Sequence, residues 1–355
     1  MDYKGKYKIF DALLVKTYPL KERTNKVHLE NIVDPKTISA QSFDVGVETV
    51  EEIEVIAQKI VAARKAGKPV IVFTGAHLIK NGLSRLLIEL VKLDMVTLIA
   101  GTGAVAIHDF ELALIGQTSE YVPNALEEGQ FGMAYEFAYP NTALQLGNKY
   151  KLGYGESLAK MICDETFRDE VLAIAAKDDS PKEFSNKQLS VLAACYEKSI
   201  PFTVHVGIGT DVIDQHKSFD GKAKGGCSGR DFLIYAEEVT KLTQGGVVLN
   251  IGSAVTGPEV FLKAVSMAGN IGKTPDNITT ADFDLRKHEP AKMTDEAAQC
   301  YYFRDQKSVV TRIPQAFNGK GYYIQGNQKA TVPLLYKNIM KYLRKNNGRD
   351  YLKNN

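Results

Sequence analysis

The segment Val70-Ile-Val-Phe-Thr-Gly-Ala-His77 decides the fold that we expect, because it joins a short apolar strand to a glycine turn and then to a helix. The same order occurs twice more, in residues 96–109 and in residues 246–259. A strand that runs through glycine-containing backbone into a helix N-terminus is how α/β folds hold phosphates and nucleotides. Three such turns predict one crevice at the carboxyl ends of parallel strands.

Length and composition favour a large globular protein. The 355 residues can bury a large core, and a net charge of +2 with both signs spread along the chain indicates no nucleic-acid partner. No apolar run has membrane-spanning length, and residues 1–4 lack the apolar region of a signal peptide. We therefore expect a cytoplasmic protein with no membrane partner. The four cysteines are widely spaced, which favours reduced structural thiols over disulfides or a zinc site.

Hydrophobic periodicity predicts strands that alternate with helices. Helices are expected at residues 50–64, 82–92, 109–115, 158–177, 187–198, 231–242, 260–267 and 332–343. Strands are expected at residues 70–74, 95–100, 202–206, 247–249, 277–283 and 308–312, and residues 120–148 are expected to be partly loop. This alternation predicts an α/β fold of Rossmann type, with a largely parallel sheet covered by helices on both faces.

One domain is the organisation that we favour. We expect an N-terminal arm at residues 1–46, a nucleotide-binding domain at residues 47–345 and a polar tail at residues 346–355. This organisation is favoured because no long Pro/Gly/Ser linker marks a division, and a boundary near residue 150 is the alternative.

The glycine turns are the first candidate site. Their backbone N–H groups can face a pyrophosphate beside helix N-termini, although glycines that only make tight turns are the alternative. Their repetition at three strand ends favours nucleotide binding. None of them is G-x-G-x-x-G or G-x-x-x-x-G-K-[ST], so the standard Rossmann fingerprint and the P-loop are both missing. A further strand end at residues 279–284 offers Thr280 and Asp282 for cofactor contacts, or else a turn closed by an Asp side chain.

The strand at residues 202–206 should deliver a second set of polar residues to the crevice. Thr210 and Asp211 follow it closely, and a carboxylate there can bind ribose hydroxyls or an amine. His216 is close enough in sequence to act as an acid or base near neutral pH. His205 lies inside the strand, and we interpret it as a packed core histidine.

His108 and Asp109 follow the second turn and are further candidates for acid–base chemistry, although Asp is also a good helix cap. The spacing of His77, His108, His205 and His216 matches no standard metal pattern, so we expect no metal site. The sequence also lacks a local Ser/His/Asp or Cys/His signature of a hydrolase.

In this order the segments resemble the deoxyhypusine synthase superfamily over about residues 50–345. Residues 71–83 resemble the family's first strand and loop, residues 96–109 its Thr-Ala-Gly-Gly turn, and residues 210–211 its Thr-Asp-Gly segment. Residues 247–254 resemble its triple-glycine strand end, residues 279–284 its Asn-Thr-Ala-x-x-Phe-Asp stretch, and residues 332–335 its closing Phe-Pro-Leu-Leu helix.

The resemblance implies an NAD-binding α/β fold, usually a homotetramer with sites at subunit interfaces. The family oxidises spermidine with NAD, transfers a butylamine group through an imine on a lysine, and then reduces the product. By position, the residues expected to contact NAD are Thr74, Gly75, Ala76, His77, Gly101, Thr102, Gly103, Asp211, Gly252, Ser253, Ala254, Thr280, Ala281 and Asp282.

The chain departs from the family at the catalytic lysine. The family has this lysine in a Trp-Gly-Lys context, but this chain has no Trp, and counting back from Pro333 by the family's spacing reaches Pro314. The family's paired histidines are replaced by Gly257-Pro258-Glu259, and a polyamine-binding carboxylate position is occupied by His216. Without the lysine the imine relay fails.

We therefore expect a divergent NAD-dependent enzyme that acts on an amine, polyamine or amino acid, with His108, Asp109, His216 and Asp211 as acid–base candidates. One alternative is true deoxyhypusine or homospermidine synthesis, with Lys307 or Lys320 as a displaced nucleophile. A non-catalytic NAD-binding protein is the other alternative.

Overall fold

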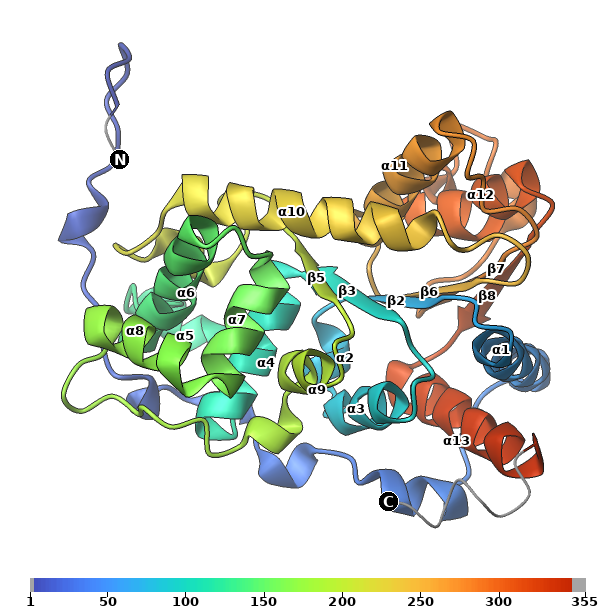
Figure 1. The fold of residues 1–355 in the computed structure, drawn as a ribbon, viewed down its shortest axis with the longest axis horizontal. Coiled ribbons are helices and arrows are strands. Elements are labelled where there is room, and N and C mark those ends of the chain that lie inside the picture. The colour runs from blue at the N-terminus through green and yellow to red at the C-terminus, as the bar shows by residue number, and fades with distance from the viewer. Residues whose placement is uncertain (1–2, 347–355) are drawn as a thin grey trace.

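A parallel six-stranded sheet forms the centre of the computed structural model, which describes residues 3–346 (Figure 1). Its strands are β2 (Val70–Thr74), β3 (Leu98–Thr102), β5 (Phe202–His205), β6 (Val247–Ile251), β7 (Thr279–Asp284) and β8 (Lys320–Gln325). They lie in the order β5-β3-β2-β6-β7-β8, and every neighbouring pair is parallel. The predicted α/β class with a parallel sheet is confirmed.

The strand order reverses between β2 and β6. The chain first builds β2, β3 and β5 outward to one edge, and then returns to the centre to build β6, β7 and β8 outward to the other edge. Thr74 at the end of β2 pairs with Ile251 at the end of β6, so both strands end at the same level. This is the strand order of the dinucleotide-binding Rossmann fold, in which ligands bind beyond the carboxyl ends at the reversal.

Helices cover both faces of the sheet, as the sequence predicts (Figure 1). One face packs on α10 (Gly221–Val239), α11 (Thr256–Asn270) and α12 (Ile313–Ala316). The other face packs on α1 (Val47–Lys65), α3 (Ser84–Lys92), α4 (Gly103–Ile115) and α13 (Gln328–Asn346). β2 and β6 are buried along their whole length because both of their faces are covered, which explains their continuous apolar sequences.

A second group of helices packs beside the edge strand β5. It contains α6 (Ala138–Lys149), α7 (Tyr154–Cys163), α8 (Glu165–Ala175) and α9 (Val191–Glu197), on the left of Figure 1. The short helix α2 (His77–Lys80) follows the carboxyl end of β2. The short helix α5 (Val122–Glu127) lies in the segment before α6. Among the described residues, no helix is both long and apolar enough to cross a membrane.

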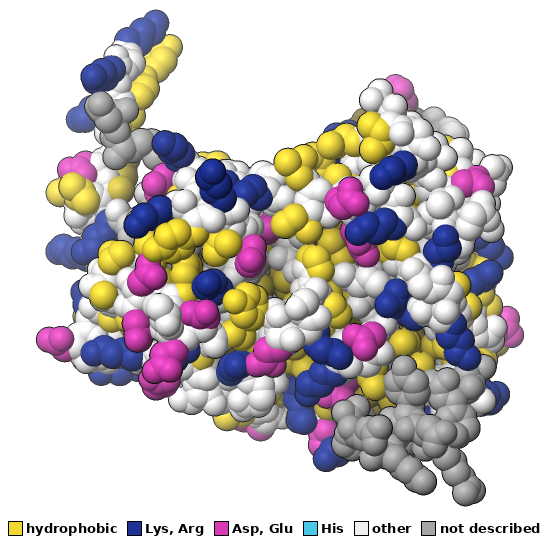
Figure 2. Space-filling model, in the orientation of Figure 1, with side chains coloured by type: hydrophobic (Ala, Val, Ile, Leu, Met, Phe, Trp, Pro, Cys, Tyr) yellow, Lys and Arg dark blue, Asp and Glu magenta, His cyan; other side chains and the backbone are white. Residues whose placement is uncertain are grey.

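The N-terminal region divides into a packed part and a projecting part. β1 (Asn25–Val27) pairs antiparallel with β4 (Thr118–Glu120), and Leu20 and Ile38 are buried in the core. Residues 3–14 project from the body, with Tyr7, Phe10 and Leu13 exposed (Figures 1 and 2). The proposed division at residue 46 stays a prediction, and the predicted polar tail lies, from residue 347 onward, outside the described residues.

The strand predicted at residues 308–312 is wrong. This segment is part of the π-helix η10 (Gln306–Arg312), and the last strand is β8 instead. The sequence Ser-Val-Val-Thr looks like a strand because β-branched residues favour extended backbone. In the structure the Thr311 hydroxyl donates to the carbonyls of Gln306 and Lys307, and the Thr280 hydroxyl donates to the carbonyl of Val309.

Two of the predicted helices differ most from the structure. The helix predicted to start at residue 231 starts at Gly221, where the Asp220 carboxylate caps the backbone N–H groups of Lys222 and Ala223. The first turns of this helix were not predicted because they are rich in glycine, which disfavours helix. One of these glycines, Gly226, packs closely on α6, since a Cβ there would lie 2.4 Å from Asn148 Oδ1. The helix predicted at residues 158–177 is divided into α7 and α8 at Asp164, which caps α8.

Candidate functional site

The loops after β2 and β6 meet where the strand order reverses. The Gly75 N–H donates to the carbonyl of Ile251 at 2.9 Å, and a Cβ on Gly75 would lie 2.2 Å from the Gly252 carbonyl oxygen. Gly252 has a φ of +69°, which side chains other than glycine rarely adopt. Thr74 is buried beneath this contact, and its hydroxyl donates to the Gly75 carbonyl at 2.9 Å. Two of the three predicted turns are therefore adjacent.

The β6 turn leads directly into α11. Ser253 is buried, and its hydroxyl accepts the Gly257 N–H at 2.9 Å in the first turn of this helix. Gly252 and Ala254 are exposed beside it. On the β2 side, Ala76 is half-buried and His77 is exposed. The pKa of His77 is lowered, first by partial desolvation of its ring and then by the charges of Lys80 and the nearby His108. These exposed residues lie at a helix N-terminus, where the helix dipole favours a phosphate group.

The third turn, after β3, is already filled by a carboxylate. Gly101 and Gly103 are buried, and a Cβ on Gly103 would lie 2.0 Å from Asp211 Oδ2. The Asp211 carboxylate also accepts the Ala104 N–H in the first turn of α4. A negative group therefore occupies the N-terminus of α4, where the helix dipole favours it, and it would repel a phosphate there.

Asp211 is one member of a buried ion cluster. Lys224 Nζ, on α10, lies 2.7 Å from Asp211 Oδ2 and 2.5 Å from Asp214 Oδ1. Burial raises the pKa of Asp211, and the ammonium of Lys224 opposes this rise. Asp211 thus reaches the crevice as predicted, but it does so as a paired group. Lys224 could not be predicted from the sequence, because no local pattern links it to an aspartate thirteen residues earlier.

His108 lines a small cavity of about 170 Å³ beside α4, whose charged lining residues include Arg23, Lys80, Glu120 and Asp211. His108 Nδ1 lies 2.7 Å from the Thr118 hydroxyl, which donates to Glu111 Oε2 at 2.5 Å. Glu111 Oε1 in turn pairs with Arg23 Nη1 at 2.6 Å. Burial alone would raise the pKa of Glu111, but Arg23 and then His108 hold it well below its usual range. The cavity therefore offers cations, carboxylates and one imidazole.

Asp109 and His216 lie away from the crevice. The Asp109 carboxylate is fully buried and accepts the Ser190 hydroxyl and the backbone N–H groups of Val191 and Leu192, so it caps α9. Burial raises its pKa to about 6. His216 is buried with Nδ1 2.7 Å from the Ser218 hydroxyl, and burial lowers its pKa to about 4. The sequence places both near strand ends, but Asp109 faces the start of α9, and the His216 ring is bound to Ser218 in its own loop.

His205 is a core residue, as predicted. It is buried against Phe73 and Tyr235, with ring centroids 5.5 Å and 5.3 Å away, and burial lowers its pKa to about 3.

The residues predicted on β7 are also buried. Thr280 and Ala281 are fully covered, and Asp282 Oδ1 accepts the side-chain amide of Asn250 at 2.7 Å. Thr102, at the end of β3, is half-buried.

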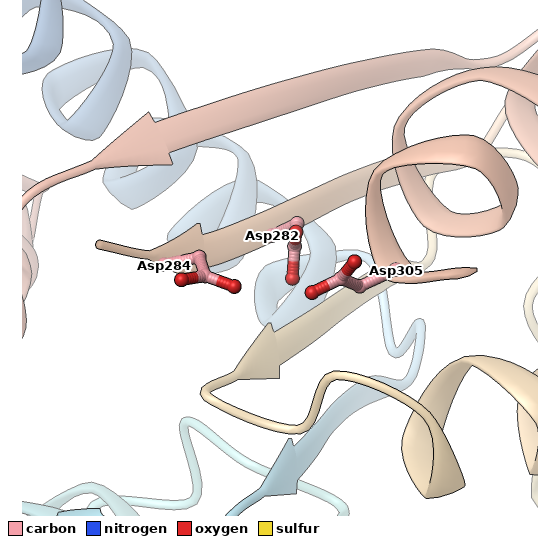
Figure 3. A group of neighbouring side chains, drawn as sticks. All are labelled: Asp282, Asp284 and Asp305. Atoms are coloured by element: carbon pink, nitrogen blue, oxygen red, sulfur yellow. The ribbon is translucent and has the colours of Figure 1, made fainter. Parts of the chain in front are cut away.

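Three carboxylates meet near the end of β7: Asp282, Asp284 and Asp305 (Figure 3). Over residues 3–346 this is the one group of three or more His, Cys, Asp or Glu side chains close enough to share a metal ion. Asp284 and Asp305 were not selected from the sequence. The alternation of Asp282 and Asp284 in one strand was a usable signal for the first two, but nothing local pointed to Asp305.

No protein-family model matches the sequence, and a search of curated proteins finds no match. Solved structures similar to this chain include ArgZ, an arginine dihydrolase from the ornithine-ammonia cycle in cyanobacteria, with 16% identity and a TM-score of 0.47 over 86% of this chain and 33% of ArgZ. They include AgrE, solved with ornithine and NAD+, with 16% identity and a TM-score of 0.47 over 85% of this chain and 34% of AgrE. This chain spans about a third of the length of either protein.

A third similar structure belongs to the family that the sequence resembles. It is described as a "putative deoxyhypusine synthase from Entamoeba histolytica", with 10% identity and a TM-score of 0.40 over 92% of this chain and 97% of that protein.

Proposed function

We propose that this chain is a divergent relative of deoxyhypusine synthase that binds NAD and acts on an amine, polyamine or amino acid. The observation that carries the proposal is the strand order β5-β3-β2-β6-β7-β8, with the turns of Gly75 and Gly252 in contact at its reversal. In folds with this order, a dinucleotide spans the crevice at that point.

The residues at the reversal fit the pyrophosphate of NAD. Gly252 and Ala254 are exposed beside the N-terminus of α11, whereas Asp211 already fills the N-terminus of α4. We therefore assign the pyrophosphate to the β2–β6 turns and not to the β3 turn. Bound NAD would supply a hydride acceptor. The chain's own task is then to hold the substrate and to move one proton.

His108 is the proton-transfer group that we assign. Its Nδ1 is held by the Thr118 hydroxyl, and that hydroxyl is held by Glu111, so the imidazole has a fixed orientation. The cavity beside it also presents Arg23 and Lys80 to a carboxylate, and Glu120 and Asp211 to an ammonium group. This combination of charges suits an amino acid or a short amine. Asp109 and His216 supply structure in this proposal, because the Asp109 carboxylate caps α9 and the buried His216 ring is bound to Ser218.

Binding and turnover test the proposal separately. Calorimetry with NAD should show saturable binding, and an absorbance screen at 340 nm (the absorption of NADH) with polyamines and basic amino acids should identify a substrate. Gly252→Ala should weaken NAD binding about ten-fold or more, because its Cβ would lie 2.2 Å from the Gln328 side chain at a positive φ.

Gly272→Ala is the matched control, since Gly272 has a φ of +75° but open space around it. His108→Gln should keep NAD binding and lower turnover by about 10²-fold or more. Failure of the wild-type chain to bind NAD would overturn the proposal.

One observation favours a second candidate, synthase chemistry through Lys307. Lys307 is buried in η10 with Nζ 3.3 Å from the centre of the Tyr301 ring. Burial, then Arg312 and Arg304, lowers its pKa, which an imine-forming lysine needs. Lys320 is the first residue of the edge strand β8 and is exposed. Borohydride trapping with spermidine and NAD should then label the wild type but not Lys307→Met; an unlabelled wild type would exclude this candidate.

A further inference from the structure

The three carboxylates of Asp282, Asp284 and Asp305 converge from two elements. Asp282 and Asp284 alternate along β7, so their side chains leave the same face of the sheet. Asp305 directly precedes η10, which packs over that face. One oxygen from each carboxylate lies within 4.8 Å of the others, and Figure 3 shows the three groups pointing toward one another.

Asp282 has an oxygen that the rest of the chain leaves without a partner. Its side chain is fully buried, and Asn250 donates its amide to Oδ1 at 2.7 Å. Asn250 is itself fixed, because the same amide group donates to the Ser253 carbonyl at 2.8 Å. Oδ2 of Asp282 is buried with no hydrogen-bond partner among the described residues. Buried carboxylate oxygens are nearly always satisfied, so this one requires an explanation.

The charge of the cluster is also unbalanced. Arg286 forms ion pairs with Asp284 and with Asp305, and its guanidinium stacks on the Phe303 ring at 4.3 Å. Within residues 3–346 no ion pair connects Asp282 to a cation. In their ionised forms, the three carboxylates exceed the one guanidinium by two negative charges, and uncompensated charge is costly in a buried place.

We propose that Asp282, Asp284 and Asp305 bind one divalent cation of the hard, oxygen-preferring class that includes Mg²⁺, Mn²⁺ and Ca²⁺. A single divalent cation balances the two remaining charges and gives Asp282 Oδ2 a ligand. Oxygens on opposite sides of such a cation are about 4–5 Å apart, since each bond is about 2.0–2.6 Å. The observed separations of up to 4.8 Å therefore allow all three to bind. Asn250 acts as the outer partner that orients Asp282.

Direct binding of Mn²⁺ to the full-length chain tests this proposal. Electron paramagnetic resonance should show one bound Mn²⁺ per chain, displaced by Mg²⁺ or Ca²⁺, after the protein has been treated with EDTA and dialysed. Asp282→Asn and Asp305→Asn should each weaken Mn²⁺ binding about ten-fold or more. Asp231→Asn is the matched control: Asp231 is as buried, but its carboxylate accepts the N–H groups of Gly155 and Val204, and Mn²⁺ affinity should be unchanged.

Thermal unfolding separates a cation site from a purely structural cluster. For a cation site, Mn²⁺ raises the melting temperature of the wild type and not that of Asp282→Asn. If either buried variant fails to fold, Asp284→Asn, at a half-buried position, replaces it.

The proposal is overturned if the wild type shows no saturable Mn²⁺ binding, or if the cluster variants bind Mn²⁺ as tightly as the wild type. Both readouts are made without NAD. A chain that binds Mn²⁺ but not NAD would therefore refute the proposed function alone.

Discussion

Replacing Lys224 by methionine should destabilise the fold strongly, because it removes the cation from a buried cluster. The Lys224 side chain is 1% exposed, and those of Asp211 and Asp214 are 4% and 5% exposed. Methionine keeps much of the apolar stem but leaves two carboxylates facing each other without the ammonium. Removing one partner of a buried ion pair costs about 3–5 kcal/mol. The free energy of unfolding should therefore fall by about that amount at pH 7.

Urea unfolding followed by circular dichroism measures this loss. The double variant Lys224→Met with Asp214→Asn should recover part of the stability, because only one buried charge then remains. Lys241→Met is the control on the same side of the sheet, since Lys241 is half exposed and pairs only with surface glutamates. It should change the free energy of unfolding by less than about 1 kcal/mol. A loss below about 1 kcal/mol for Lys224→Met, or a double variant less stable than the single one, would refute the reasoning.

Three further perturbations test other parts of the structure. Gly75→Ala should cost about 1–3 kcal/mol in urea unfolding and abolish NAD binding in calorimetry, because the Cβ would lie 2.2 Å from the Gly252 carbonyl; wild-type stability would contradict that contact. Arg23→Met should cost about 3–5 kcal/mol because it leaves Glu111 buried and unpaired, and a smaller loss in thermal unfolding would mean that the pair is solvated. Burial lowers the pKa of His205 from 6.5 to about 3, so the stability from its neutral form is present above pH 6.5 and is lost as the pH falls toward 3. Unfolding measured from pH 7 to pH 4 should thus be less pH-dependent in His205→Phe, and equal slopes would count against a neutral core histidine.

The sequence predicted the sheet well because its central strands are continuous apolar runs. Residues 70–73 and 247–249 are apolar along their length, and both lie in strands buried on two faces. The sequence failed at residues 308–312, where a β-branched run is also apolar but forms a π-helix. A run of this kind does not reveal whether it lies in the sheet or on it, since either place buries the side chains. Only the packing of Val309 against Thr280 decides the matter.

The site was harder to predict because its charges are set by partners distant in sequence. Asp211 was expected to be a free group in the crevice, but Lys224, on a helix obscured by glycines, neutralises it. Asp109 follows a glycine turn in the sequence, yet its carboxylate caps α9, more than eighty residues later. Whether a carboxylate at a strand end is free, capping or paired depends on such contacts, and a single sequence does not contain them.

The reversal in strand order divides the crevice into two halves with different electrostatics. On the β3–β5 side, Lys224 balances the charge of Asp211 and Arg23 balances that of Glu111, so these buried charges are paired before any ligand binds. On the β6–β7 side, Asp282 is left without a cation. Under our two proposals, NAD lies over the reversal, with the His108 cavity on the first side and the cation on the second. The anionic pyrophosphate would then lie beside the carboxylate cluster. A bound cation would compensate the negative charge of that cluster, whereas without the cation an ionised Asp282 would repel the pyrophosphate. NAD affinity should therefore rise with Mn²⁺ in the wild type but not in Asp282→Asn, and an affinity independent of Mn²⁺ would show that the two sites do not interact.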